Sequence, residues 1–104
     1  MEPVVLVVAS GPRTPEAATA LALAGALQEA GHAVSLCLLQ DAILLALTRS
    51  DRPLLAPTRV YVAADDLRLR GFTVDDVTPG VQVSDHGALV DLITMDGVRT
   101  IGFL

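Results

Sequence analysis

The chain contains one cysteine, Cys37, which is the only side chain able to carry sulfur as a persulfide. A reactive cysteine needs exposure and a cation or helix N-terminus that stabilises its thiolate. Cys37 instead lies inside an apolar run, two residues before the run ends, with no basic residue beside it. Because a buried cysteine behaves as a small hydrophobic residue, we expect Cys37 to serve packing. A role as persulfide carrier is the alternative.

Gln40 and Asp41 are the only polar residues among twelve positions, 36–47. This segment is too short to cross a bilayer, which needs about 20 apolar residues, so we expect protein to bury it. The polar pair then marks a change of chain direction. Open α/β sheets bind ligands at the carboxyl ends of their strands, where this pair would stand. We expect Asp41 to cap a short helix over 41–47, and ligand binding by Gln40 or Asp41 is an additional role.

Two other loops follow predicted strands at the same edge. In the first, Ser10 and Gly11 precede Arg13, and free amides at a helix start together with an arginine can hold an anion. This loop lacks the glycine spacing of a phosphate or dinucleotide site, and a capped tight turn explains it equally well. Asp65 and Asp66 follow the third strand and could bind a metal or act as acid and base. One helix cap and one solvent-facing carboxylate is the commoner arrangement.

The remaining polar residues show no catalytic or metal-binding spacing. His32 follows the predicted stop of the first helix, and His86 lies near the start of a later one. Neither has a partner at metal-ligand spacing, and the chain shows no Ser/His/Asp or Cys/His set. We therefore expect no metal site and no cofactor.

These candidate residues are positioned by strands that alternate with helices. Apolar or β-branched runs predict strands over 4–9, 33–39, 59–64, 81–83 and 98–104. A first helix is expected over 15–30, with Thr14 as its N-cap and Gly31 as its stop. Further helices are expected over 41–47 and from 85 to about 95, and a helical turn capped by Asp65 or Asp66 ends at Gly71. Strands that are apolar on both faces predict a parallel sheet covered by helices. We expect one α/β domain over 1–104, with three layers and a mainly parallel sheet of about five strands.

The first two predicted helices, 15–30 and 41–47, are apolar on nearly every side. A helix that is apolar all round is buried all round, and an outer helix in so small a domain needs another subunit to cover it. The alternative for the first helix is that alanine simply favours helix and tolerates exposure. The hydrophobic fraction of 52% and mean hydropathy of +0.56 also favour an oligomer. Leu54 and Leu55, in a proline-containing loop over 49–58, are a further candidate partner contact.

The charge and the cysteine content limit the compartment and the partners. A net charge of −5 and a pI near 4.6 argue against direct nucleic-acid binding. One cysteine cannot form an internal disulfide, which fits a reducing compartment. The amino-terminal residues run directly into a strand pattern and lack the features of a signal peptide. We expect a cytoplasmic protein without a membrane anchor.

Several segments, in the same order and spacing, resemble the DsrE/DsrF/DsrH group of sulfur-relay proteins over nearly the whole chain. Residues 38–42, LLQDA, resemble the strand-to-helix LLQDG segment of DsrH-like proteins. VYVAA at 60–64 and LRLRG at 67–71 are similar to the third strand and "RG" turn of the group. The ending, TPGVQV at 78–83 followed by ALVDLI at 88–93 and an apolar strand, also fits.

The resemblance implies a compact α/β domain that assembles into dimers, trimers or hetero-hexamers. Sulfur-carrying members of the DsrE and TusD type hold the persulfide on a third-strand cysteine directly before the VAA segment. Here Tyr61 occupies that position, and no cysteine occurs from 49 to 104. Partner subunits of the DsrF or DsrH kind can lack this cysteine, and this chain is similar to them.

The resemblance and the missing cysteine predict a non-catalytic subunit of a sulfur-relay system. Such a subunit would act by homo- or hetero-oligomeric assembly with related chains, or by binding a sulfur-carrier protein. Two alternatives remain open. One is a sulfurtransferase that uses Cys37, and the other is a small-ligand or nucleotide-binding protein that uses the strand ends near Ser10, Gln40 and Asp65.

Overall fold

A computed structural model describes residues 3–50 and 59–104 of the 104-residue chain. Within these residues, strands and helices alternate as the apolar runs predict. The elements in chain order are β1 (Val4–Val8), α1 (Pro15–Glu29), β2 (Val34–Leu38), the 3₁₀ helix η1 (Gln40–Ala46), β3 (Arg59–Ala63), α2 (Ala64–Leu69), the 3₁₀ helix η2 (Val74–Asp76), β4 (Gln82–Ser84), α3 (His86–Thr94) and β5 (Arg99–Phe103).

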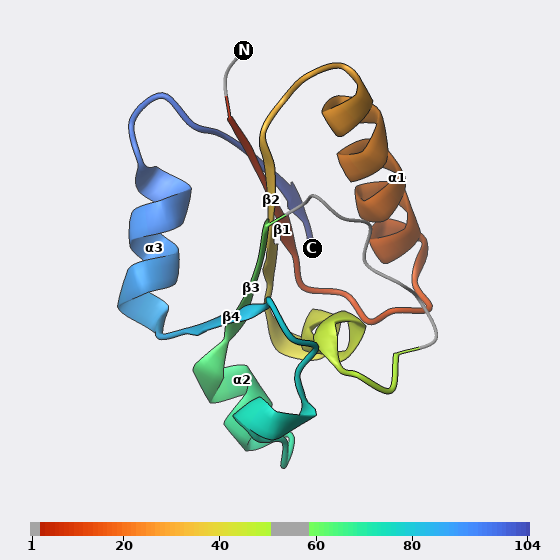
Figure 1. Ribbon diagram of the computed structural model, residues 1–104, viewed down its shortest axis with the longest axis vertical. Coiled ribbons are helices and arrows are strands. Elements are labelled where there is room, and N and C mark those ends of the chain that lie inside the picture. Colours follow the sequence, from red (N-terminus) through yellow and green to blue (C-terminus); the bar gives the residue numbers. More distant parts are fainter. Residues whose placement is uncertain (1–2, 51–58) are drawn as a thin grey trace.

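The five strands form one sheet in the order β4-β3-β2-β1-β5, and every neighbouring pair is parallel. The predicted α/β class, parallel sheet and strand number are confirmed. Because all strands run the same way, their carboxyl ends lie at one edge. The loops that leave β1, β2 and β3 therefore meet at this edge, together with η1 and α2 (Figure 1).

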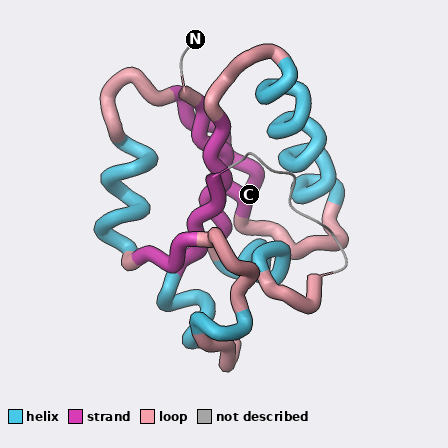
Figure 2. Tube along the Cα trace, in the orientation of Figure 1, coloured by secondary structure: helices cyan, strands magenta, loops and turns pink. Residues whose placement is uncertain are grey.

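The sheet is the middle of three layers, and Figure 2 shows it edge-on between α1 and α3. Side chains alternate between the two faces of a strand, so β1 contributes Leu6 to the α1 side and Val7 to the α3 side. The larger core cluster joins α1, η1 and the α1-facing residues of the strands. The smaller cluster lies under α3 and includes Cys37 and Leu89.

Helix α1 begins and ends as predicted. The Thr14 hydroxyl accepts a hydrogen bond from the Ala17 amide at 3.2 Å, and the chain leaves the helix through Gly31 at φ 96°. Only one stripe of α1 is buried by its own chain, and the outward residues Ala22 and Ala26 are exposed. Cover of this outer stripe by another subunit stays a prediction.

For η1, the expectation that only another subunit could bury it is wrong. Its own chain covers four of its residues, Ala42, Ile43, Leu45 and Ala46. The segment does not lie on a sheet face but closes the carboxyl-end edge, between the strand ends and α2. It is also held by a hydrogen bond of 2.7 Å from the Thr78 amide to the Ala46 carbonyl. Burial at the end of the sheet therefore explains its apolar sequence.

Two predicted helix caps are also wrong. Residue Leu39 precedes η1 without a side-chain cap, and Asp41 does not cap it. Helix α2 begins directly after β3, so Ala63 stands at its cap position and neither Asp65 nor Asp66 can occupy it. The prediction also missed η2, where the Asp76 carboxylate accepts from the Thr73 amide at 2.9 Å.

Leu54 and Leu55, the candidate partner contacts, lie outside the described residues. Across residues 3–50 and 59–104, no helix has both the length and the apolar content that a membrane span requires.

Candidate functional site

Cys37 is fully buried in the middle of the sheet. Cys37 is 0% exposed and belongs to the cluster that lies under α3. Burial raises the pKa of the thiol from 9.0 to about 11, because the surrounding apolar groups do not solvate a thiolate. This environment opposes the ionisation that persulfide chemistry requires.

Tyr61 is the neighbour of Cys37 across the β2–β3 pair. The two residues are register partners, so their side chains lie on the same face of the sheet, toward α3. Tyr61 is half-buried and lines a hollow of about 280 Å³ beside β4, together with Arg59, Gly80 and Gln82. The position that the family resemblance assigns to chemistry is therefore filled by a phenol, next to a buried thiol.

The chain turns sharply where β2 ends. Gln40 has φ 49°, the only left-handed value among the described residues that are not glycine. Its amide donates to Oδ2 of Asp66 at 2.8 Å. A non-glycine residue in this conformation is strained and persists only where its surroundings hold it. The predicted change of direction is confirmed, and Asp66 is the group that holds it.

Arg70 connects the carboxylates of this turn. Its Nε donates to Oδ1 of Asp41 at 3.0 Å, and its Nη1 lies 3.4 Å from Oδ1 of Asp66. The same nitrogen donates to the Asp66 carbonyl at 3.3 Å. We call Gln40, Asp41, Asp66 and Arg70 the strand-end corner. It fastens the start of η1 to α2.

Two of the predicted binding residues lie outside this corner. Asp65 points to solvent and pairs with Arg68 at 3.3 Å, with both side chains largely exposed. Ser10 donates from its hydroxyl to the Leu104 carbonyl at 3.1 Å. The sequence suggested Asp65 as a binding residue and no role for Arg70, because Gln40 and Asp41, which Asp66 and Arg70 contact, lie 26 and 29 residues away along the chain.

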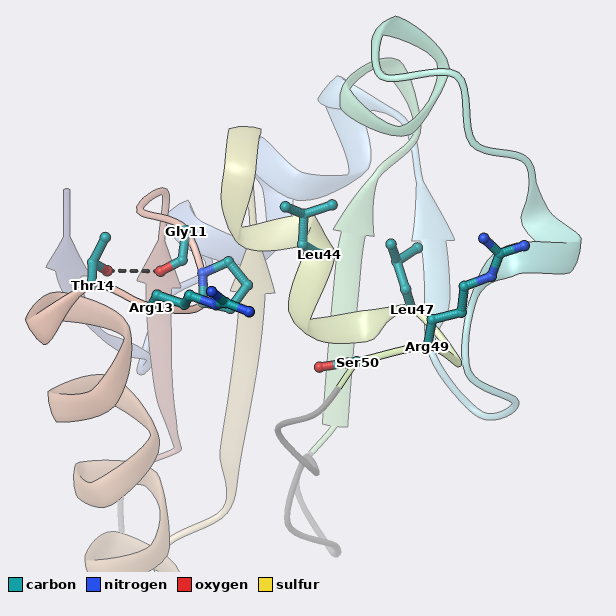
Figure 3. A pocket seen from close by; sticks show the side chains of 8 residues that line it. Gly11, Arg13, Thr14, Leu44, Leu47, Arg49 and Ser50 are labelled. Carbon is teal, nitrogen blue, oxygen red and sulfur yellow. Dashed lines mark hydrogen bonds between the residues drawn. The ribbon is translucent and has the colours of Figure 1, made fainter.

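Gly11 does lie beside the corner. A Cβ placed on Gly11 would stand 3.7 Å from Cβ of Asp41, which is van der Waals contact, so the β1–α1 loop packs beside the start of η1. Gly11 also lines an open hollow of about 520 Å³ between this loop and the end of η1. Figure 3 shows Arg13 and Arg49 on opposite sides of this hollow, with Leu44 and Leu47 between them.

The family model for DsrH-like proteins matches residues 15–97. The chain belongs to the DsrH-like family. Membership relates this DsrH-like chain to the subunits of sulfur-relay systems. No curated protein sequence matches it significantly.

Solved structures share the fold of this DsrH-like chain at low sequence identity. The YchN protein of E. coli superimposes with a TM-score of 0.75 at 22% identity, covering 97% of this chain and 100% of YchN. MTH1491 of Methanobacterium thermoautotrophicum gives 0.73 at 14% identity, covering 98% and 99%. Tm0979 of Thermotoga maritima gives 0.62 at 22% identity, covering 89% and 93%.

Among the described residues of the DsrH-like chain, no group of three His, Cys, Asp or Glu side chains could hold a metal ion. The strand-end corner contains two carboxylates, Asp41 and Asp66, and both contact Arg70. The corner is therefore a structural joint in which one arginine partly compensates two carboxylates, and both Gln40 and Asp41 are exposed.

Proposed function

We propose that this chain is a non-catalytic DsrH-like subunit of a sulfur-relay system, and that it acts through oligomeric assembly or partner binding. The observation that supports this most strongly is the burial of Cys37, the only cysteine in the sequence. A pKa of about 11 leaves about one thiol in ten thousand ionised at pH 7. A carrier of persulfide sulfur needs a far larger thiolate fraction and access for its partner.

Exposed apolar side chains support the partner-binding part of the proposal. Leu69, at the end of α2, is 80% exposed, and Val74, in the following η2, is 66% exposed. Both lie in the segment that follows β3, next to the strand-end corner. Large apolar side chains that are this exposed in an isolated subunit are candidates for a protein contact. A related subunit or a sulfur-carrier protein would cover this surface, in the cytoplasm where a lone thiol stays reduced.

The test compares the natural chain with the variant Cys37→Ala in a reconstituted relay. Each protein is co-purified with candidate relay subunits and supplied with persulfide from a cysteine desulfurase, and sulfur delivery to the final acceptor is measured. We expect equal delivery by both, and no gain of one sulfur atom on the chain in its intact mass. Loss of delivery in Cys37→Ala, with the complex still assembled, would show that Cys37 carries sulfur. Failure to retain any relay subunit would contradict the assembly role.

A further inference from the structure

Beside the proposed assembly role, the hollow between the β1–α1 loop and η1 has the composition of a ligand site. Its volume of about 520 Å³ lies within the range of small-molecule pockets. Leu44, Leu47 and Pro12 contribute apolar surface, and Arg13 and Arg49 contribute the charged groups. This is the usual pattern of such sites, where apolar walls bind the body of a ligand and a few polar groups fix its orientation.

The two arginines stand out in an acidic chain. The sequence has twelve Asp and Glu residues but only seven Arg. Arg68 and Arg70 form salt bridges, whereas within the described residues neither Arg13 nor Arg49 forms one. Asp41, whose Cβ lies beside Gly11, is bound by Arg70. The hollow therefore keeps positive charge that no described carboxylate neutralises.

Both walls of the hollow are fixed by hydrogen bonds. On one side, the Thr14 hydroxyl donates to the Gly11 carbonyl at 2.8 Å, and the Thr14 amide donates to the same carbonyl at 3.1 Å. On the other side, Leu47 pairs with Val77 in an antiparallel bridge, and the Ser50 amide donates to the Leu47 carbonyl at 3.0 Å. Because both walls are already ordered, less conformational entropy is lost when a ligand binds.

We propose that this hollow binds a small organic anion, with the apolar body of the ligand on Leu44 and Leu47 and its carboxylate or phosphate attracted by Arg13 and Arg49, which stand at the two ends of the leucine surface. A guanidinium suits both head groups because its parallel N–H donors match a pair of anionic oxygens. In Figure 3 the arginines stand at the two ends of the leucine surface, and Arg49 extends away from Leu47, so a ligand on the leucines has one positive group beyond each end.

The experiment titrates the isotope-labelled full chain in amide-resolved NMR with three probes: octanoate, acetate and 1-hexanol. Octanoate combines the charge and the apolar body, whereas each of the others has one of them. We expect saturable shifts at Gly11, Arg13, Leu44 and Leu47 with octanoate, and binding about tenfold weaker or more with the other two, because each loses one type of contact.

Variants separate a specific site from general adsorption. Arg13→Ala and Arg49→Ala should each weaken octanoate binding by about fivefold, the effect of one partly exposed charge contact. Arg68→Ala is the matched control, because Arg68 is an exposed arginine on α2 that does not line the hollow, and its affinity should be unchanged. Octanoate shifts that map to another surface, or equal binding by all three variants and the natural chain, would overturn the proposal. Neither result bears on the assembly role.

Discussion

The Gln40 amide and the Asp66 carboxylate are joined by a hydrogen bond of 2.8 Å across 26 residues of chain. Leu39, which precedes η1, has no side-chain acceptor for the amides at the start of this helix. The Asp66 carboxylate supplies that acceptor instead. Asp66 thus acts as a cap from a neighbouring element, and its negative charge suits the amino end of a helical segment. The same carboxylate pairs with Arg70, so one side chain both holds the strained turn and fixes α2 against it.

The first prediction uses the adjacent aspartates. Replacing Asp66 by alanine removes the acceptor of the Gln40 amide and one partner of Arg70. We expect the free energy of unfolding in urea to fall by about 1–2 kcal/mol. Asp65→Ala is the matched control, since Asp65 forms only an exposed pair with Arg68, and it should change stability by less than about 0.5 kcal/mol. Equal losses in the two variants would contradict the assigned role of Asp66.

The second prediction concerns the backbone of Gln40. Glycine adopts a φ of 49° without the steric cost that a side chain brings. Gln40→Gly should therefore raise the free energy of unfolding, by up to about 1 kcal/mol, while Gln40→Val should lower it, because β-branching makes this conformation worse. Urea unfolding of both variants measures the difference. A glycine variant less stable than the valine variant would show that the left-handed turn is not strained.

The third prediction follows from the raised pKa of Cys37. Below pH 9 the thiol is protonated in the folded and the unfolded chain, so its contribution to stability is constant. Between pH 9 and about 11 the unfolded chain ionises while the folded chain does not. The free energy of unfolding should therefore fall as pH rises through this window, by about 2–3 kcal/mol in total.

Cys37→Ala provides the control for this pH dependence. The variant lacks the ionisable thiol, so the part of the decline that is due to Cys37 should disappear, although a cavity lowers stability at every pH. Thiol alkylation checks the same burial by another route: Cys37 should react only after unfolding. Rapid alkylation of the native chain at pH 8 would contradict the buried thiol and favour the sulfurtransferase alternative.

The fourth prediction tests the proposed contact surface. Leu69→Ser removes an apolar side chain that is 80% exposed, so the isolated fold should lose little stability, whereas assembly should weaken about tenfold if this leucine is a contact centre. Light scattering after size-exclusion chromatography measures assembly. Leu104→Ser alters an equally exposed leucine at the end of β5 and should leave assembly unchanged. The proposed surface would be wrong if Leu69→Ser assembled as well as the natural chain.

The candidate site was only partly predictable. Gln40, Asp41 and Gly11 come together as expected, because the carboxyl ends of parallel strands share one edge of the sheet. The choice between Asp65 and Asp66 depends on which face of α2 each residue occupies. Since α2 begins directly at the end of β3, Asp65 and Asp66 both lie in its first turn and point in different directions. Asp66 faces Gln40, whereas Asp65 faces solvent. No local sequence feature gives that rotation.

The sequence by itself determined the α/β class, the parallel sheet, the position of α1 with its Thr14 cap, and the packing environment of Cys37. These follow from the alternation of apolar runs and from local capping chemistry, which act over a few residues. Only the tertiary structure decided that η1 is buried by its own chain at the end of the sheet. It alone also paired Arg70 with Asp41 and Asp66, and set Arg13 and Arg49 on opposite sides of one hollow. Such contacts depend on how distant segments meet, and that is fixed by the packing of the whole core.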